Sequence, residues 1–436
     1  MSASVPAAPT ESEIITDVVC AGCGCLCDDI EVTRQGNAIT ALENVCPKGD
    51  AWFHAPRFAE DAPCRIEGRP TTMEAAIARA AKLLEGAKFP LVYGMAEADI
   101  DAQRAAVELA DRIGGAIDLA DFGGHAAGVL AMQEVGEVTC SLGEVKGRAD
   151  LVVIWGANPL ETHPRLYSRY AVDPTGRWIM SGRSDRTVIA VDSRSTRTTA
   201  DADRFIPIPP ESDFEALWIL RAMVKGVELD AAAAARTGLD LVALADLAER
   251  MKRARFGVVF FGAGLAESRG EHRNIEAMLR LVRDLNAFAC FAVRPLGAPG
   301  NTAGAENVLA WQTGFPFAIS LAHGAPKHNE REFAATPLLE KGEVDAAVIL
   351  AADPLVEMAP AAARYLRTIP TIALDVRETE TFRSATVAIP IAQYGIHVAG
   401  GAHRMDDVPL PLRPVLSSKL PAAEKVLKTL IAAFAR

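Results

Sequence analysis

Two kinds of hydrophobic pattern alternate along most of the chain. From about residue 73, apolar positions recur at helical spacing, as in 73–84 and 101–113. Short, fully apolar runs separate these stretches and predict buried strands: 91–93, 151–155, 187–191, 257–261, 346–350 and 371–374. Strands that alternate with helices are typical of parallel sheets covered on both faces, which is the doubly wound α/β architecture.

The first 64 residues follow a different pattern. Short alternating stretches at 28–32 and 38–42 predict small strands around a group of cysteines, so we expect a separate module there. The predicted organisation is a cysteine-cluster module at 1–64, a discontinuous α/β domain at 65–142 and 255–436, and an inserted α/β domain at 143–254.

The chain also repeats itself. An apolar run ends at Asn158-Pro159, and a similar one ends at Asp353-Pro354, 195 residues later. Downstream, five residues recur at an offset of 183: Asp192, Arg194, Thr196, Ile206 and Pro207 return as Asp375, Arg377, Thr379, Ile389 and Pro390. Two related α/β units explain this pattern. The Asx-Pro turns would lie at the carboxyl ends of strands, where open sheets bind ligands, or they simply end the strands.

Composition and charge narrow the classes of function. A net charge of -11 disfavours nucleic acid or an anionic membrane as the main partner, because both require a basic face. No apolar run approaches the roughly 18 residues of a membrane span, and the first 15 residues lack the pattern of a secretory signal. We therefore expect a cytoplasmic protein.

The cysteines supply the first candidate chemistry. Six of the eight lie between Cys20 and Cys64, and four have the spacing C-x2-C-x3-C-x18-C: Cys20, Cys23, Cys27 and Cys46. Three thiolates on one loop and a distant fourth can surround a [4Fe-4S] cluster or a tetrahedral zinc ion. Vestigial or merely buried thiols are the alternative. Cys25, inside the loop, would be a fifth thiol.

A cysteine loop that precedes two α/β domains resembles the molybdopterin and tungstopterin oxidoreductases. Within them, the chain is similar to the family of formylmethanofuran dehydrogenase B subunits. The matching segments are spread over most of the sequence: 23–29, 143–146, 155–159, 163–165, 182–187, 268–270, 272–276, 313–316 and 404–406.

One departure from the family changes the functional prediction. Active members hold tungsten or molybdenum through a cysteine or selenocysteine followed by histidine, whereas this sequence has Gly124-His125 before the helix at 129–133. Glycine has no side chain to donate, so the resemblance implies that no tungstopterin or molybdopterin binds and that redox turnover is lost. His125 and Arg294 would be remnants of the substrate site, and we predict no catalytic residue.

Members of the family that have degenerated in this way are B subunits of the bacterial formyltransferase/hydrolase complex. The resemblance implies a non-redox scaffold in the oxidation of formaldehyde to formate. Its partners would be an amidohydrolase-like A subunit that acts on formyl-methylofuran, a scaffold C subunit, and a D subunit that transfers formyl groups to and from tetrahydromethanopterin. An active dehydrogenase with a replacement ligand and an iron-sulfur electron-transfer protein are the alternatives.

Two weaker features complete the candidates. The arginines around 183–197 could hold phosphate or polyglutamate carboxylates through bidentate contacts, or serve only the fold: Arg183, Arg186, Arg194 and Arg197. Gly262-Ala263-Gly264 follows a predicted strand and would approach a phosphate, although a tight turn explains it equally well. The histidines of the second half lack ligand spacing and are expected to be structural or exposed.

Overall fold

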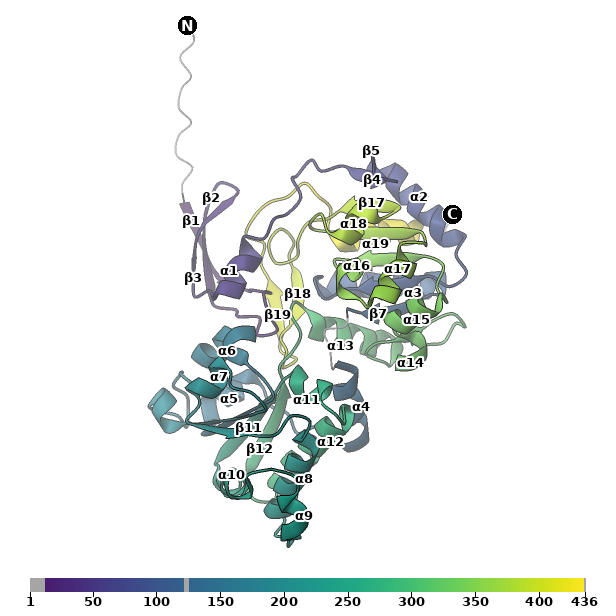
Figure 1. Ribbon diagram of the computed structural model, residues 1–436. Coiled ribbons are helices and arrows are strands. Elements are labelled where there is room, and N and C mark those ends of the chain that lie inside the picture. Colours follow the sequence, from purple (N-terminus) through teal and green to yellow (C-terminus); the bar gives the residue numbers. More distant parts are fainter. Residues whose placement is uncertain (1–11, 121–124, 435–436) are drawn as a thin grey trace. The chain divides into compact units, whose positions relative to one another are not determined.

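The computed structural model describes residues 12–120 and 125–434 and divides them into two compact units (Figure 1). Of these residues, unit 1 comprises 12–120, 299–404 and 409–434, and unit 2 comprises 125–298 and 405–408. His125 begins a helix, but its side chain lies outside the described part, and Gly124 lies outside it altogether. None of the helices within the described ranges has the length and apolar character needed to cross a membrane.

Unit 1 begins with a three-stranded antiparallel sheet and continues with a nine-stranded sheet in the order β14-β13-β7-β6-β15-β16-β17-β4-β5. Its strands are β1 (Ser12–Val18), β2 (Ile30–Gln35), β3 (Ala38–Glu43), β4 (Cys64–Ile66), β5 (Arg69–Thr71), β6 (Leu91–Gly94), β7 (Ala116–Leu119), β13 (Ile319–Ser320), β14 (Lys327–His328), β15 (Ala347–Leu350), β16 (Thr371–Asp375), β17 (Val387–Pro390), β18 (Gly400–His403) and β19 (Pro409–Leu412). Its helices are α1 (Pro47–Phe53), α2 (Met73–Glu85), α3 (Ile100–Ile113), α13 (Thr302–Thr313), α14 (Glu330–Phe333), α15 (Ala335–Lys341), α16 (Pro354–Glu357), α17 (Pro360–Leu366), α18 (Glu380–Ser384) and α19 (Ala423–Ala433).

Unit 2 is built on a five-stranded sheet in the order β10-β9-β8-β11-β12, in which every pair is parallel. Its strands are β8 (Leu151–Trp155), β9 (Thr187–Asp192), β10 (Arg204–Pro207), β11 (Phe256–Phe261) and β12 (Cys290–Pro295). Its helices are α4 (His125–Val135), α5 (Leu142–Arg148), α6 (Pro159–Thr162), the π-helix η1 (Leu166–Ala171), the 3-10 helix η2 (Gly182–Asp185), α7 (Arg197–Asp201), α8 (Asp213–Val224), α9 (Ala231–Ala235), α10 (Leu241–Arg253), α11 (Ala263–Glu267) and α12 (His272–Leu285).

Local sequence signals explain where several helices begin and end. The side chain of Asp99 accepts a hydrogen bond from the Asp101 amide at the start of α3, and Gly114 ends this helix in the left-handed conformation at φ 62°. Ser141 and Glu144 form a reciprocal capping box at the start of α5. The core of unit 2 then forms where one face of the sheet packs against apolar residues of α8, α10 and α12, including Leu220, Leu247 and Leu281.

The two sheets share one plan. The order β7-β6-β15-β16-β17 in unit 1 corresponds to β12-β11-β8-β9-β10 in unit 2. Along the chain, the five strands β6 to β10 form a first series. The strands β11, β12, β15, β16 and β17 form a second series that repeats the first in the same order. Each compact unit combines two strands of one series with three strands of the other, and the repeat seen in the sequence is the remnant of this arrangement.

The domain boundary differs from the sequence-based prediction. We predicted an inserted domain at 143–254, but β11 and β12, after residue 254, pair in parallel with β8 and extend the same sheet. The inserted unit therefore continues to residue 298 and already includes α4, which begins at His125. The apolar pattern at 257–261 predicts a buried strand, but it does not predict which of the two similar sheets contains that strand.

Equivalent hydrogen bonds identify the turns after β8 and β15 as structural parts of the repeat. Asn158 Oδ1 accepts from the amide and hydroxyl of Thr198 at 3.2 and 2.7 Å. Asp353 Oδ1 accepts from the same two groups of Thr381 at 2.9 and 2.7 Å. Each Asx side chain thus ties its turn to the short helix after the neighbouring strand. This favours the structural reading of both Asx-Pro turns.

Candidate functional site

The predicted metal-binding loop is compact. The amide of Cys20 donates to the Cys27 carbonyl at 2.9 Å, and the amide of Leu26 donates to the Cys23 carbonyl at 3.2 Å. Cys20, Cys23, Cys25 and Cys27 are buried. The half-buried Cys46 is brought to the loop by α1, where it is the N-cap residue before Pro47.

The thiol of Cys20 is affected by burial and by its neighbours. Burial raises the pKa of Cys20 well above its usual value, and the neighbouring thiols of Cys27, Cys23 and Cys46 raise it further. The pKa of Cys25 is also raised, first by its hydrogen bond with Cys23 and then by burial. Cys23, Cys27 and Cys46 therefore lie near enough to influence the thiol of Cys20. Neutral thiols are favoured until a cation stabilises the thiolate form.

The surroundings of the loop suit a soft metal centre. A Cβ on Gly49 would lie 2.9 Å from Cys20 Sγ and 3.9 Å from Cys46 Sγ, so a larger residue would occupy the space beside these thiols. Several thiolates are the donor set that zinc and iron-sulfur clusters prefer. Within residues 12–120 and 125–434, however, no three His, Cys, Asp or Glu side chains stand close enough together to bind one metal ion. Both centres fit the donors, and their identity stays a prediction.

The remaining cysteines lie apart from this loop. Cys64 is buried in β4, where its thiol contacts Met73 Sδ at 3.9 Å. Cys140 belongs to unit 2, where burial raises its pKa to about 12, and Cys290 is exposed at the start of β12. None of the three completes the predicted ligand set.

Arg294, the predicted remnant of a substrate site, is committed to bonds within unit 2. Its guanidinium is 4% exposed, donates to Thr139 Oγ1 and to the Met405 carbonyl at 2.6 Å, and lies 3.6 Å from Asp407. Glu137 is close enough to feel this charge, although burial has the larger effect and raises its pKa. Arg294 therefore joins the 137–140 segment to residues 405–407.

The carboxyl-end turns of unit 2 pack against each other. A Cβ on Gly262 would meet Ala157 Cβ at 2.9 Å, and one on Gly264 would meet the Gly156 carbonyl oxygen at 2.8 Å. These glycines therefore allow two turns to approach closely, which supports the tight-turn explanation of the Gly-x-Gly pattern. His163 Nε2 lies 3.0 Å from the Gly297 carbonyl oxygen, so this matched histidine also serves the local fold.

Two of the four candidate phosphate-binding arginines have structural partners. Arg183 forms a bidentate ion pair with Asp203 at 2.8 and 2.7 Å. Arg186 is 5% exposed and donates to four backbone carbonyls, those of Lys146, Ala149, Val172 and Pro174. Arg194 and Arg197 stay exposed after β9. The predicted cluster thus does not form one cationic surface.

Unit 1 carries two acids, Glu97 and Asp375, near the carboxyl ends of its strands. Glu97 is half-buried and follows β6, and Asp375 is buried and is the last residue of β16. Both lie near the point where the chain connections on either side of β6 and β15 run in opposite directions. Burial raises the pKa of Glu97 to about 7 and that of Asp375 to about 6. Tyr394 donates to Glu97 Oε2 at 3.3 Å. No motif marks Glu97, whereas Asp375 was visible as part of the internal repeat.

Backbone strain accompanies these acids. Met95 and Ala351, which follow β6 and β15, have φ values of 73° and 48°, a region that residues with a Cβ seldom occupy. Such strain clusters at functional sites, so the carboxyl edge of unit 1 is a candidate binding site.

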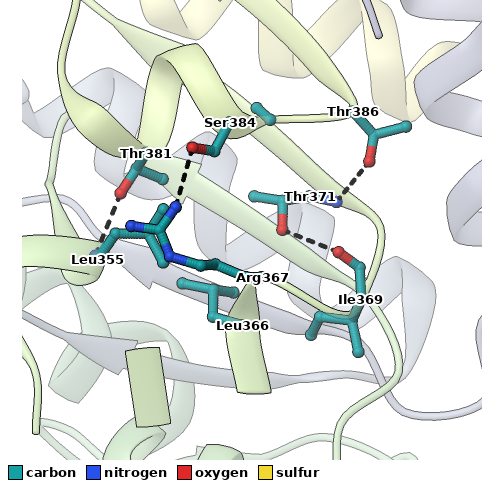
Figure 2. Close-up of a pocket in the computed structure, with 9 residues that line it drawn as sticks. Leu355, Leu366, Arg367, Ile369, Thr371, Thr381, Ser384 and Thr386 are labelled. Atoms are coloured by element: carbon teal, nitrogen blue, oxygen red, sulfur yellow. Dashed lines mark hydrogen bonds between the residues drawn. The ribbon is translucent and has the colours of Figure 1, made fainter. Parts of the chain in front are cut away.

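Unit 1 has a small polar pocket whose lining side chains already form hydrogen bonds or ion pairs with neighbouring residues (Figure 2). Arg367 lies at hydrogen-bond distance from Ser384 Oγ at 3.3 Å and pairs with Glu380 at 3.2 Å. Thr381 and Thr386 accept backbone amides, both at 3.2 Å. With its cation neutralised and its hydroxyls bonded, this pocket is a poor candidate site.

The histidines of the second half serve local structure. His328 Nδ1 lies 2.7 Å from the Phe317 carbonyl oxygen, and His403 Nδ1 lies 2.8 Å from Asn307 Nδ2. Burial lowers the pKa of His397 to about 4, so this ring is neutral at pH 7. They do not form a cluster that could bind a metal, in the described ranges.

Comparison with known proteins gives the family. The chain is 39% identical over 431 residues to the B subunit of tungsten-containing formylmethanofuran dehydrogenase 2 from Methanocaldococcus jannaschii, covering 96% of this chain and 98% of that protein. The chain belongs to the family of formylmethanofuran dehydrogenase B subunits. This confirms the family predicted from the cysteine loop and the dispersed segments. No family model matches the sequence.

The chain is also similar to more distant proteins. The B subunit of the formyltransferase/hydrolase complex of Methylorubrum extorquens is 28% identical over 66% of this chain and 74% of that protein. A crystal structure of that complex with methylofuran contains a chain that matches with a TM-score of 0.71 and 25% identity, over 85% of this chain and 98% of that one. Acetylene hydratase from Pelobacter acetylenicus shares the fold, with a TM-score of 0.66 and 14% identity over 97% of this chain and 69% of that one. The predicted molybdopterin-oxidoreductase-like fold is confirmed.

Proposed function

We propose that this chain is the non-redox B subunit of a formyltransferase/hydrolase complex and that it acts as a scaffold. The proposal is carried by Gly124-His125 in the sequence. The resemblance to the family implies that Gly124 takes the place of the thiolate or selenolate that binds the metal in active members. Gly124 lies outside the described residues, but its residue type is sufficient here. The side chain of glycine is a hydrogen atom, which cannot coordinate a metal. A soft metal centre that depends on a protein thiolate is therefore not expected here.

The hydrogen bonds of unit 2 support this proposal. Arg294 is buried, and its two terminal nitrogens donate to Thr139 and Met405, although its Nε has no hydrogen-bond partner among the described residues. His163 and the glycine turns are likewise occupied by contacts within the unit. A retired active site that has become part of the structural core explains all three.

The partners follow from the proposed complex. They are an amidohydrolase-like A subunit that releases formate from formyl-methylofuran, a scaffold C subunit, and a D subunit that transfers formyl groups between methylofuran and tetrahydromethanopterin. The match to a chain of the complex that was crystallised with methylofuran supports this assignment. The chain would work in the cytoplasm, in the oxidation of formaldehyde to formate.

The proposed function leaves the cysteine loop as a structural metal centre. Cys20, Cys23, Cys27 and Cys46 would hold a [4Fe-4S] cluster or zinc. Closing four thiolates around a metal would stabilise a small module that has only a three-stranded sheet and one short helix.

An active dehydrogenase is the second candidate, and one observation favours it. Identity to the tungsten enzyme is 39% over nearly the whole chain, against 28% over two thirds of it for the relative from the formyltransferase/hydrolase complex. We favour the scaffold because overall identity reflects the shared fold, whereas a ligand to the metal depends on a single position. In the dehydrogenase alternative, another residue would have to replace the missing thiolate.

The two functions predict different activities for the assembled complex. When the chain is coexpressed with its A, C and D subunits, the scaffold function predicts that formate is released from formyl-tetrahydromethanopterin and methylofuran without any electron acceptor. It also predicts that the complex reduces no viologen dye in the presence of formate or formyl-methylofuran. Dye reduction above that of a complex lacking this chain would contradict the proposal.

A further inference from the structure

The cysteine loop contains a tight turn at residues 23–26. The amide of Leu26 donates to the Cys23 carbonyl at 3.2 Å and closes the turn. Leu26 is 1% exposed and has a φ of 33°, which a residue with a Cβ adopts only where its surroundings enforce it. The buried side chain of Leu26 thus holds the turn in one conformation, and this turn fixes the backbone of Cys25.

The thiol of Cys25 forms a buried hydrogen bond. Cys25 is 0% exposed, and its partner is the thiol of Cys23. The bond raises the pKa of Cys25, which is the effect that a hydrogen bond has on the group whose proton it uses. Cys25 is therefore the donor, and the sulfur of Cys23 is the acceptor. Because solvent does not reach Cys25, water does not compete for this donor.

The spacing of the cysteines separates Cys25 from the predicted ligands. Cysteine ligands on one loop usually have about two to four residues between them. Two residues lie between Cys20 and Cys23, and three lie between Cys23 and Cys27, whereas one residue separates Cys25 from each neighbour. Cys20, Cys23 and Cys27 are thus spaced as ligands, and Cys25 lies among them as a thiol that need not bind the metal.

Thiolates around a buried metal require hydrogen-bond donors. Four thiolates carry more negative charge than a zinc ion neutralises, and most of the predicted ligands are buried. The backbone provides one donor, because the amide of Gly22 donates to Cys20 Sγ at 3.5 Å. Cys25 provides another donor, directed at Cys23. Donors of this kind orient metal ligands, and removing one typically weakens metal binding by about 10–100-fold.

We infer that Cys25 is a positioning residue of the metal centre, which keeps its thiol proton and donates a hydrogen bond to the Cys23 thiolate without binding the metal itself. The inference rests on the structural metal centre of the proposed function. The hydrogen bond would stabilise the negative charge on Cys23 Sγ when the metal is bound and would hold this sulfur in the orientation that the metal requires. Because the bond exists before the metal binds, the loop is already ordered for binding.

A packing role is the simpler explanation of a buried cysteine. A thiol in a protein core behaves as a small apolar group, so Cys25 would then only fill space. The two roles predict opposite orders for two variants. Serine keeps a donor but is more polar than cysteine, whereas alanine is apolar and has no donor. A donor role is retained by Cys25→Ser and lost in Cys25→Ala, but a packing role is impaired more by serine than by alanine.

The test is binding of Zn²⁺ and Co²⁺ to the whole metal-free chain, measured anaerobically by competition with a chromophoric chelator. We expect Cys25→Ala to bind both ions about tenfold more weakly than the wild type, at the lower end of the usual range because a thiol is a weak donor. Cys25→Ser should bind them with nearly wild-type affinity. The stoichiometry and the thiolate-to-cobalt absorption band should stay unchanged in both variants, because the four ligands remain.

Cys64→Ala is the matched control. Cys64 is 4% exposed, and its thiol also donates to a sulfur, that of Met73 at 3.9 Å, but outside the cysteine loop. We expect this variant to bind both ions as the wild type does. Equal affinities of Cys25→Ala and the wild type, or weaker binding by Cys25→Ser than by Cys25→Ala, would contradict the inference alone.

Two further outcomes would also be decisive. A weaker thiolate-to-cobalt band in both Cys25 variants would contradict the inference, since Cys25 would then be a ligand. Failure of the wild type to bind either ion would contradict the metal centre of the proposed function and the inference together. Thermal unfolding of each metal-free variant verifies that its fold is retained.

Discussion

Replacing Arg186 by alanine is expected to lower the free energy of unfolding by about 2–3 kcal/mol, because buried carbonyl groups lose a charged donor. The guanidinium is 5% exposed and satisfies the carbonyls of Lys146, Ala149, Val172 and Pro174. Its removal leaves these acceptors without their donor in a place that water reaches poorly. Denaturant unfolding of the purified variant would measure the change.

Two further variants serve as controls for Arg186→Ala. Arg183→Ala removes a neighbouring arginine whose ion pair with Asp203 is one-third or more exposed, so it should change stability by less than about 1 kcal/mol. Arg186→Lys keeps the charge but not the planar fork of donors, and we expect it to recover only part of the loss. Equal effects of the two alanine substitutions would contradict the structural role given to Arg186.

Replacing Cys27 or Cys46 by serine is expected to remove nearly all bound iron or zinc. Each substitution removes one of four thiolates, and the hydroxyl of serine is a far poorer ligand for a soft metal. Because binding of the metal is coupled to folding of the module, each variant should also unfold at a lower temperature. Metal analysis of anaerobically purified protein and thermal unfolding would test both effects.

Cys64→Ser is the control for the cysteine loop. Cys64 is buried like most of the predicted ligands, but it lies in β4 and contacts Met73 instead of the loop. Its replacement should leave the metal content unchanged. If the wild type carries no stoichiometric iron or zinc, or if Cys64→Ser loses as much metal as Cys27→Ser, the predicted ligand set would be wrong.

The strands that the sequence predicted are those with uninterrupted apolar runs. Residues 151–155 and 257–261 lie in β8 and β11, which are central strands buried on both faces. The strands β7, β10 and β17 were missed because a charged residue or a proline interrupts their apolar runs, whereas β6 and β15, of the same length, were found. The helices predicted at 73–84 and 101–113 are confirmed to within one residue at each end. Their capping residues lie where the helical spacing of apolar positions begins, so both signals predict the same start.

Pairing between distant segments limited the prediction of domains and of the site. Which sheet β11 joins depends on contacts between strands that are about 100 residues apart in sequence, and two similar sheets compete for it. For the same reason, the burial of Glu97 beside Tyr394 could not be predicted, since neither residue belongs to a motif. The cysteine spacing could be interpreted because its ligands are close in sequence, apart from Cys46.

The internal repeat predicted the relation between the two α/β units. Offsets of 195 and 183 pointed to two related units, and the matching bonds of Asn158 and Asp353 confirm that equivalent turns are built in the same way. The offsets differ because the elements between each turn and its partner helix differ in length. The repeat therefore predicted that the two units are related. Only the order of strands in the sheets shows that each unit combines strands from both series.

Elemental analysis for tungsten and molybdenum, with release and detection of any pterin, tests the central claim most directly. The measurement should use anaerobically purified complex that contains this chain. Our account predicts neither metal above trace levels and no pterin, because Gly124 provides no ligand. Near-stoichiometric tungsten or molybdenum together with pterin would contradict the scaffold function and identify a working dehydrogenase.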